Sequence, residues 1–251
     1  SVAVRDLAIH PRDKDLVIAT HGRGIWIIDD ITPLRALTPA DLAKEAAFIE
    51  AKPTVQRIPA GGGWANGDAV FVGNNPTSEA VITYYQQKRH IFGDLKIEIL
   101  DESGKLLSTV PSSKRRGLSR AAWSMRLKAP RVPTAAGAAF GAATGPRVLP
   151  GTYTVKMTKD KNVYTTQLQV MPDPRSKHTP ADRRAQFDLS MKLYHLLGDM
   201  SFAVDRINGV RLALDRAAAM LPANDPLVAR LRAVSAQVDE LRRKIVATKE
   251  G

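Results

Sequence analysis

The spacing of apolar residues changes once along this chain, and that change constrains the fold more than any other feature. Between residues 68 and 172 apolar residues recur about every second position in short runs, which is typical of β-strands. After Pro172 and Pro174 they recur every three or four positions, which is typical of an amphipathic helix. The sequence therefore predicts a mixed, mainly β fold that ends in a helical region.

The β-rich segment, residues 68–172, contains strand runs separated by turn residues. Asp101-Glu102-Ser103-Gly104 and Lys159-Asp160-Lys161-Asn162 each join two runs as a hairpin turn. Short strands with such turns predict an immunoglobulin-like β-sandwich. Residues 129–146 are rich in Ala, Gly and Pro and are expected to form an insertion. The expected strands are Ala69–Val72, Ala80–Tyr85, Leu95–Leu100, Leu106–Val110, Arg120–Leu127, Thr152–Thr158 and Tyr164–Val170.

Residues 176–249 are predicted to form an antiparallel helical hairpin. Thr179 is the predicted N-cap of the first helix, and Pro180 is its first residue. Asp225 is the predicted N-cap of the second helix, and Pro226 lies at the start of that helix. At 1.5 Å per residue the first helix would run ~60 Å and the second ~30 Å, so the second covers only about half of the first. The rest must contact the sandwich, an absent domain or another subunit, unless the helix bends at a glycine. Apolar residues of the second helix alternate in steps of four and three, which predicts a coiled-coil seam at residues 227, 231, 234, 238, 241 and 245.

The first 35 residues read as three short strands with a glycine-bearing turn at residues 21–24. Three short strands do not form a stable domain by themselves. They need to pack against other parts of a protein. Residues 36–67 are expected to be a linker with a short helix that begins at the Thr38 cap and ends near Ala47.

The net charge of +12 is concentrated in one segment. Residues 105–147 carry nine basic side chains and no acidic one, including the run Lys114-Arg115-Arg116. Such a segment could attract an acidic partner, or it could simply be a solvated surface. The chain has no cysteine, which excludes disulfides, thiolate metal ligands and a cysteine nucleophile. No window approaches the roughly 18 apolar residues of a membrane span, and no signal peptide is visible at the start of this sequence.

Several motifs resemble one protein family. The run from Asp6 to Asp30 contains His10-Pro11-Arg12-Asp13 and Thr20-His21-Gly22-Arg23-Gly24-Ile25-Trp26-Ile27-Ile28-Asp29-Asp30. It is similar to the last blade of bacterial β-propeller proteins with BNR (Asp-box) repeats, which are related to sortilin/VPS10 propellers and are often labelled glycosyl hydrolases. Gly117-Leu118-Ser119-Arg120-Ala121-Ala122-Trp123 and Pro150-Gly151-Thr152-Tyr153 resemble two further strands of that family, the second also found in FlgD-type modules. Ser119 and Ser124 stand where the family has Asn and Asp.

The resemblance implies that residues 1–35 are a closing propeller-blade fragment and that the propeller itself lies outside this sequence. It also implies an exported bacterial protein, periplasmic or extracellular. The expected partners are that propeller and a protein or second copy bound through the helical hairpin, with an acidic polymer as a further possibility.

Candidate site residues are few. His21 and Arg23, on the glycine-bearing turn, and Lys114, Arg115 and Arg116 are the positions that could contact a ligand or partner. The glycines beside His21 and Arg23 also suit a tight turn, and Asp29-Asp30 also suits the end of a strand. Tyr84-Tyr85 is expected to pack in the core with one ring facing inward. No carboxylate pair, histidine cluster, phosphate loop or dinucleotide motif is present, so we expect no catalytic residue, no cofactor and no metal site.

Three hypotheses follow. The preferred one is a non-catalytic accessory region that supports a propeller and mediates assembly or partner binding. The second is a supporting region of a propeller glycoside hydrolase whose active site lies in the absent N-terminal part. The third is a binder of acidic polymers through residues 105–147.

Overall fold

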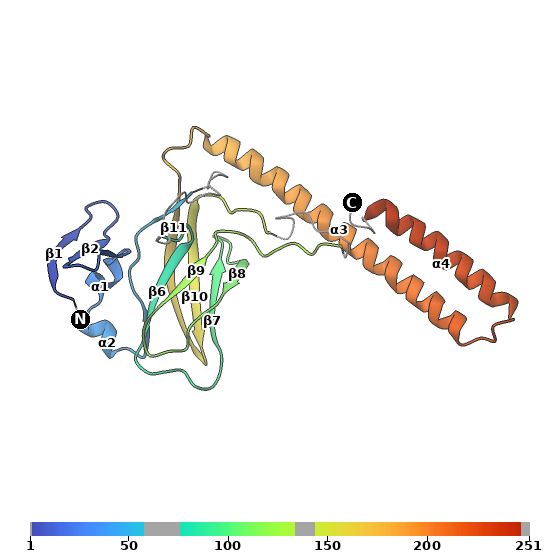
Figure 1. Cartoon of the computed structure of the whole chain (residues 1–251), viewed down its shortest axis with the longest axis horizontal. Helices are drawn as coiled ribbons and strands as arrows, with labels where there is room; N and C mark the ends of the chain where they lie inside the picture. Colours follow the sequence, from blue (N-terminus) through green and yellow to red (C-terminus); the bar gives the residue numbers. More distant parts are fainter. Residues whose placement is uncertain (1, 58–75, 134–143, 247–251) are drawn as a thin grey trace. The chain divides into compact units, whose positions relative to one another are not determined.

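The computed structural model describes residues 2–57, 76–133 and 144–246. The chain divides into two compact units, the first made of Ser1–Met125 and Leu149–Lys177, the second of Arg126–Val148 and His178–Gly251. The first unit contains the β-sheets and the second the two long helices (Figure 1). The prediction of a mixed fold with β-sheets followed by a C-terminal helical region is therefore confirmed.

The first three strands, β1 (Val4–Ile9), β2 (Leu16–Thr20) and β3 (Ile25–Ile28), form an antiparallel sheet in the order β1-β2-β3, which we call the N-terminal sheet. Gly22 and Gly24 have φ angles of 80° and 77° in the turn between β2 and β3. That left-handed conformation favours glycine, so the predicted glycine-bearing turn is confirmed. Two short helices follow, α1 (Thr32–Ala36) and α2 (Pro39–Ala43).

Helix α2 begins as predicted but ends earlier. The Thr38 side chain accepts a hydrogen bond from the Asp41 backbone, and the Asp41 side chain accepts one from the Thr38 backbone, which forms a capping box. The expectation that the helix continues to Ala47 is wrong, because Ala46–Phe48 forms strand β4 and pairs with β6. Both alanines are buried there, so burial and strand pairing outweigh the intrinsic helix preference of alanine.

The other strands form two sheets that we call the two-sheet core. One sheet has the order β5-β11-β10-β7-β8, and the other has the order β4-β6-β9. All neighbours are antiparallel except β5 and β11, which are parallel. The remaining strands are β5 (Thr54–Gln56), β6 (Ala80–Gln86), β7 (Leu95–Leu100), β8 (Leu106–Val110), β9 (Gly117–Trp123), β10 (Gly151–Lys159) and β11 (Asn162–Pro172).

The predicted strands agree with this arrangement except at three places. The run predicted at Arg120–Leu127 lies earlier, at Gly117–Trp123, and leaves the sheet before Met125, whose φ is 55°. Strands β4 and β5 lie in the segment that we expected to be a linker. Each has only three residues, too few to show a period-two pattern. The predicted strand Ala69–Val72 lies outside the described residues.

The two sheets pack through large apolar side chains. Trp123 on β9 is 1% exposed, and its ring meets the edge of the Tyr153 ring on β10 at a centroid distance of 5.2 Å. Tyr84 and Tyr85, neighbours on β6, are both buried, whereas we expected one ring to face outward. The Tyr85 hydroxyl donates to the carbonyl oxygen of Leu42 at 3.4 Å, so the segment around α2 covers the face that alternation alone leaves open.

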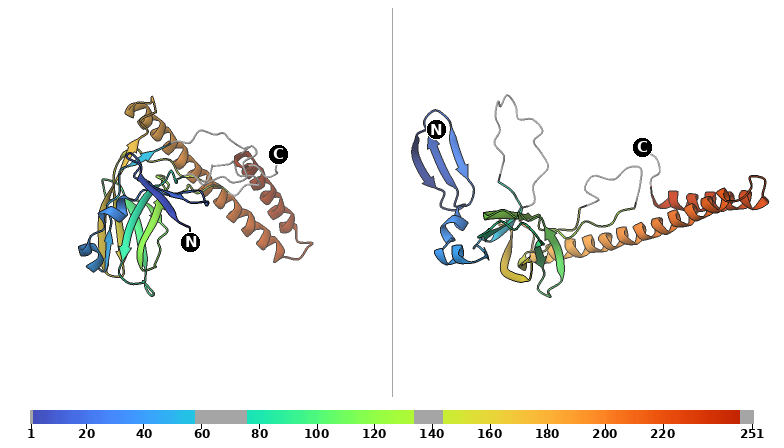
Figure 2. Two further views of the ribbon diagram at one scale, coloured as in Figure 1. Left: turned by 60° about the vertical axis from the view of Figure 1, so that its left-hand side comes forward. Right: turned by 90° about the horizontal axis from the view of Figure 1, so that it is seen from below.

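The second unit contains α3 (Pro180–Ala219) and α4 (Pro226–Ile245), which lie side by side (Figure 2). The predicted caps Thr179 and Asp225 are both present. Helix α3 continues without interruption through Gly198 and Gly209, so neither glycine ends it. Ser235 donates to Asp215 at 2.9 Å and Arg211 pairs with Asp239 at 3.0 Å, and this pattern of partners means that the helices run antiparallel.

Half of the residues in the predicted coiled-coil seam of α4 do not pack against α3. Val228, Ser235 and Asp239 are the buried residues of this helix. Leu227, Val234 and Leu241 are exposed in spite of their heptad spacing. The polar pairs with α3 rotate the contact face of α4 by about one residue, because a buried carboxylate such as Asp239 is stable only where arginines can reach it.

Candidate binding surfaces

The N-terminal sheet exposes apolar side chains on both faces. Ile25, Trp26 and Ile27 are 71%, 61% and 60% exposed, and successive residues of a strand point to opposite faces. A sheet with both faces apolar is stable only when both are covered. Four further exposed apolar residues of this sheet are Val4, Leu7, Ile9 and Ile28.

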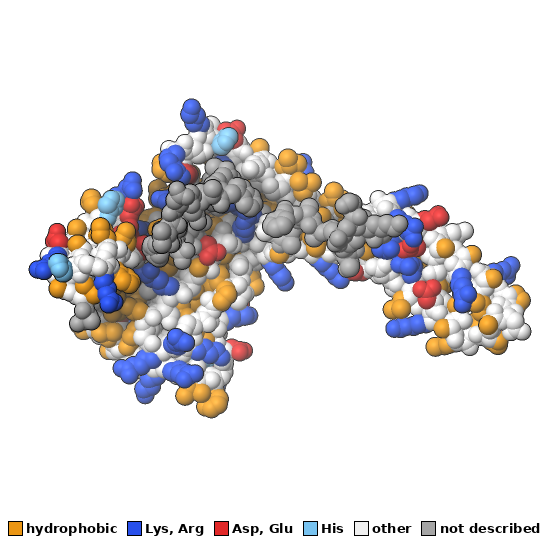
Figure 3. Space-filling view, viewed as in Figure 1, with side chains coloured by type: hydrophobic (Ala, Val, Ile, Leu, Met, Phe, Trp, Pro, Cys, Tyr) orange, Lys and Arg blue, Asp and Glu red, His pale blue; other side chains and the backbone are white. Residues whose placement is uncertain are grey.

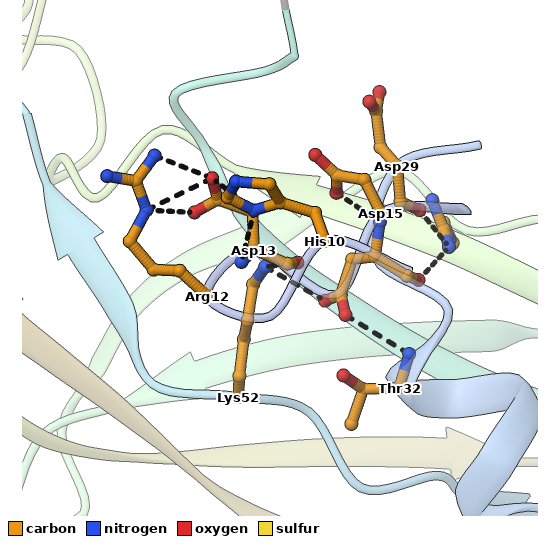
Figure 4. A network of polar contacts seen from close by, with 9 residues as sticks. His10, Arg12, Asp13, Asp15, Asp29, Thr32 and Lys52 are labelled. Carbon is orange, nitrogen blue, oxygen red and sulfur yellow. Dashed lines mark hydrogen bonds and ion pairs between the residues drawn. The ribbon is translucent and has the colours of Figure 1, made fainter. Parts of the chain in front are cut away.

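The end of the N-terminal sheet is held to the two-sheet core by basic side chains (Figure 4). Arg120 on β9 donates to the backbone carbonyl oxygens of Asp29 and Asp30 at 3.2 and 2.9 Å. Lys52 donates to the carbonyl oxygen of Asp13 at 2.7 Å and lies 3.8 Å from the Asp30 carboxylate. Sequence reasoning did not single out Arg120 or Lys52, since both bind backbone groups that no sequence pattern marks.

The carboxylates of Asp15, just before β2, and Asp30, just after β3, have a structural role. The Asp15 carboxylate accepts the Asp30 backbone N–H at 2.9 Å, and the Asp30 carboxylate accepts the Thr32 backbone N–H at 3.1 Å (Figure 4). Asp30 has a φ of 45°, a conformation that aspartate adopts more readily than most residues. These contacts fix the turn from β3 into α1.

His21 and Arg23 lie exposed on the turn between β2 and β3. The His21 backbone N–H donates to the carbonyl oxygen of Ala3 at 3.0 Å. No contact among the described residues joins either side chain to Lys114, Arg115 or Arg116. The predicted site residues therefore occupy two separate places in the first unit.

Lys114, Arg115 and Arg116 lie exposed on the segment between β8 and β9. Lys114 donates to the carbonyl oxygen of Gly93 at 2.6 Å, and its own carbonyl accepts the His90 backbone N–H at 2.9 Å. These bonds join the segment to the loop at residues 87–94, which carries exposed Lys88 and Arg89. Figure 3 shows Lys and Arg side chains gathered at the lower end of the two-sheet core. We call Lys88, Arg89, Lys114, Arg115 and Arg116 the basic cluster.

Two apolar residues project beside the basic cluster. Ile91 and Phe92, in the same loop, are 67% and 83% exposed. Gly93 has a φ of 79°, and a Cβ there would lie 2.1 Å from the Asp160 carboxylate, so this loop conformation requires glycine. Sequence reasoning missed Phe92 as a surface residue. The sequence signal that could have found it is its position between a basic pair and a glycine.

The same end of the core contains a charge pair. Lys159 is 4% exposed, and its ammonium lies 2.6 Å from the Glu45 carboxylate, which also accepts from Asn162 at 2.9 Å. The hydrogen bond from Lys159 is the main cause that lowers the pKa of Glu45 below its ordinary value. Glu45 comes directly before β4, so the pair joins that strand to the hairpin of β10 and β11.

Among the described residues, no group of three or more His, Cys, Asp or Glu side chains is placed to hold a metal ion. In the same part of the chain, no helix is both long and apolar enough to cross a membrane.

Comparison with known proteins does not assign this chain to a family. No family model matches the sequence, and no curated protein matches it. The crystal structure of CopC from Methylosinus trichosporium OB3b aligns with 53% of this chain and 99% of its own, at 14% identity and a TM-score of 0.25. A TM-score that low supports no inference about fold or function.

The Glu45–Lys159 pair yields a stability prediction. We expect Glu45→Gln to lower the free energy of unfolding by about 1 kcal/mol at pH 7, because the buried Lys159 ammonium loses its counter-charge while solvent at the half-exposed position 45 screens part of the effect. Since the pKa of Glu45 is lowered on folding, its contribution is present at neutral pH and is lost as the pH falls below about 4. Urea unfolding at several pH values measures both effects.

The matched control is Glu102→Gln, which removes an exposed carboxylate in the turn between β7 and β8 and should change stability by less than about 0.5 kcal/mol. Equal effects of the two substitutions would contradict a stabilising role of the pair, as would a Glu45→Gln effect that persists unchanged at low pH.

Proposed function

We propose that this chain is a non-catalytic interaction region of an exported β-propeller protein, and that the N-terminal sheet belongs to the closing blade of the propeller. The observation that carries this proposal is the exposure of apolar side chains on both faces of the N-terminal sheet.

A propeller blade is a four-stranded antiparallel sheet that packs between neighbouring blades. The N-terminal sheet has three antiparallel strands. A fourth strand from a propeller chain would complete it, and the adjacent blades would cover Ile25 and Ile27 on one face and Trp26 on the other. The motif resemblance of residues 6–30 points in the same direction.

The contacts of Arg120 and Lys52 support a linking role for the two-sheet core, which we interpret as an immunoglobulin-like sandwich. Both side chains bind the backbone of the N-terminal sheet at its end. These bonds join segments about 90 and 39 residues apart in sequence, so they would hold a completed blade against the core.

The test is to isolate the protein from its natural source in neutral buffer and to combine native mass spectrometry with peptide mapping. We expect a propeller polypeptide with repeated blades, covalently attached or co-purifying. When both parts are expressed as separate chains, the double substitution Ile25→Asp and Ile27→Asp should abolish co-purification, because it places charge on one covered face.

Ile91→Asp, which changes an equally exposed apolar residue away from the N-terminal sheet, should leave co-purification intact. A lone species of 27.3 kDa whose β3 amides are protected from hydrogen exchange would contradict the proposal.

The helices of the second unit are proposed as an assembly element that binds a second copy of the chain. Leu227, Val234 and Leu241 lie seven residues apart on α4 and are exposed, which is the spacing of a coiled-coil contact. A row that repeats every seven residues on one helix pairs naturally with the same row of a second copy around a two-fold axis.

We expect size-exclusion chromatography with light scattering to give a dimer for the unaltered chain and a monomer when these three residues are changed to Ser. The control changes three exposed apolar residues of the two-sheet core, Ile91, Leu106 and Val163, to Ser and should remain dimeric. A monomeric unaltered chain at high concentration would remove the assembly proposal.

A second candidate function is binding of an acidic polymer, and the position of Phe92 favours it. Proteins that bind single-stranded nucleic acid combine basic side chains with exposed aromatic rings. Trp123 is buried and does not serve this purpose, but Phe92 is exposed in the same loop as Lys88 and Arg89. The basic cluster therefore combines charge with one ring.

This candidate predicts salt-dependent binding of heparin or single-stranded DNA, measured by fluorescence anisotropy at several salt concentrations. Changing Lys114, Arg115 and Arg116 to Ala should reduce the slope of log K against log salt by about 2–3, since each lost contact releases one counterion fewer. The control replaces Lys192, Arg216 and Arg232, exposed in the second unit, and should leave the slope unchanged. Phe92→Ala should weaken DNA binding but not heparin binding, and unchanged affinity in the triple variant would exclude this function.

A further inference from the structure

The loop that joins β6 to β7, residues 87–94, presents two large apolar side chains at its surface. Ile91 and Phe92 are adjacent in sequence and are 67% and 83% exposed. Exposed apolar side chains that gather inside a polar rim mark places where a protein meets a partner. We call Ile91 and Phe92 the apolar tip.

Hydrogen bonds on both sides of the apolar tip fix the loop. Just before the tip, His90 is buried and its backbone N–H donates to the Lys114 carbonyl oxygen at 2.9 Å. Just after the tip, the Gly93 carbonyl oxygen accepts from the Lys114 ammonium at 2.6 Å. The apolar tip therefore projects from a supported base, so little conformational freedom is lost when it binds a partner.

Basic side chains gather at the base of this loop. The basic cluster supplies five, and exposed Lys161, in the turn between β10 and β11, supplies a sixth. The Asp160 backbone N–H donates to the Asp94 carbonyl oxygen at 3.3 Å and joins that turn to the loop. Figure 3 shows these Lys and Arg side chains close to apolar side chains at the lower end of the two-sheet core. We call the basic cluster together with Lys161 the basic rim.

Within the part of the chain that the structure describes, no carboxylate forms an ion pair with a side chain of the basic rim. Lys114 donates to a neutral carbonyl oxygen, which leaves its charge in place. Of the acidic residues at this end of the core, Glu45 already pairs with Lys159. Asp94 and Asp160 are two carboxylates against six basic side chains, so this surface has an excess of positive charge.

The chemistry of the apolar tip distinguishes between partners for this charge. Heparin offers no apolar group to Ile91 or Phe92, and the bases of single-stranded nucleic acid stack on aromatic rings rather than on an aliphatic side chain. The surface of a bilayer suits both residues, because its phosphates attract Lys and Arg while its acyl chains accept any apolar side chain. The position of the aliphatic Ile91 beside Phe92 therefore favours a lipid surface.

We propose that the apolar tip and the basic rim bind the surface of a bilayer that contains anionic phospholipids. Ile91 and Phe92 enter the boundary between headgroups and acyl chains, and the basic side chains bind the lipid phosphates. The site lies entirely in the first unit and does not depend on the propeller proposal. It assigns the basic cluster a partner other than an acidic polymer, and the two alternatives differ in what they require of Ile91.

Co-sedimentation of the full chain with lipid vesicles tests the proposal. One set of vesicles is phosphatidylcholine alone, and the other is an equal mixture of phosphatidylcholine and anionic phosphatidylglycerol. We expect the mixed vesicles to bind at least about tenfold more tightly, since attraction to a charged surface adds to the burial of the apolar tip. Added salt should weaken that binding, because it screens the attraction between the basic rim and the phosphates.

Variants of the apolar tip separate a lipid partner from an acidic polymer. Ile91→Ser should weaken binding to the mixed vesicles about tenfold, because it removes apolar surface that enters the bilayer. It should leave binding of single-stranded DNA unchanged, since an aliphatic side chain does not stack on bases. Combining it with Phe92→Ser should weaken vesicle binding further and leave heparin binding unchanged. Thermal unfolding should be unaltered in both variants, because both side chains are exposed.

The matched control changes Leu106 and Met171 to Ser. Both are exposed apolar residues, and they lie at the ends of β8 and β11 that are remote from the loop. This variant should bind the mixed vesicles like the unaltered chain.

Three results would overturn the proposal. The first is no binding of the mixed vesicles, or equal binding of both kinds of vesicle, by the unaltered chain. The second is unchanged vesicle binding when Ile91 and Phe92 are both changed to Ser. The third is an equal loss of binding in the control variant. Binding of heparin or single-stranded DNA without vesicle binding would overturn the lipid proposal and support the acidic polymer in its place.

Discussion

The contact between the Trp123 and Tyr153 rings joins the two sheets of the core, and it lies close in sequence to the points where the chain leaves and re-enters that core. Trp123 ends β9, three residues before the chain passes into the second unit at Arg126. Tyr153 follows the return at Leu149. Because the two rings are 5.2 Å apart, the departing and returning segments start close together, and Arg126 and Arg147 can form a backbone bridge.

The N-terminal sheet and the basic cluster would bind a partner through different forces, because their exposed side chains differ. The N-terminal sheet satisfies its backbone internally and exposes apolar side chains, so the force that would bind a partner there is the removal of apolar surface from water. The basic cluster lies on loops whose backbone groups accept from side chains such as Lys114 and Gln86. Its charges stay in water, where attraction to a partner is long-ranged and weakened by salt.

Much of the fold was predictable from the sequence. The caps at Thr38, Thr179 and Asp225, the glycine-bearing turn and most strands of the core were identified, because each depends on residues close together in the chain. Strands β4 and β5 were missed, since three residues carry no period and only pairing with β6 and β11 makes them strands. The apolar spacing of α4 did not show which of its residues pack on α3: Leu227, Val234 and Leu241 are exposed, because the ion pairs of Asp239 decide that face.

The candidate sites divide in the same way. The sequence by itself determined that residues 105–147 carry only positive ionisable charge, and it identified Lys114, Arg115 and Arg116. It did not associate them with Lys88, Arg89 and Phe92. That grouping joins segments 20 or more residues apart through hydrogen bonds to the backbone. Local patterns record which side chains are present, but distances between remote segments are set by how the chain buries its apolar surface, and only the tertiary structure decides that.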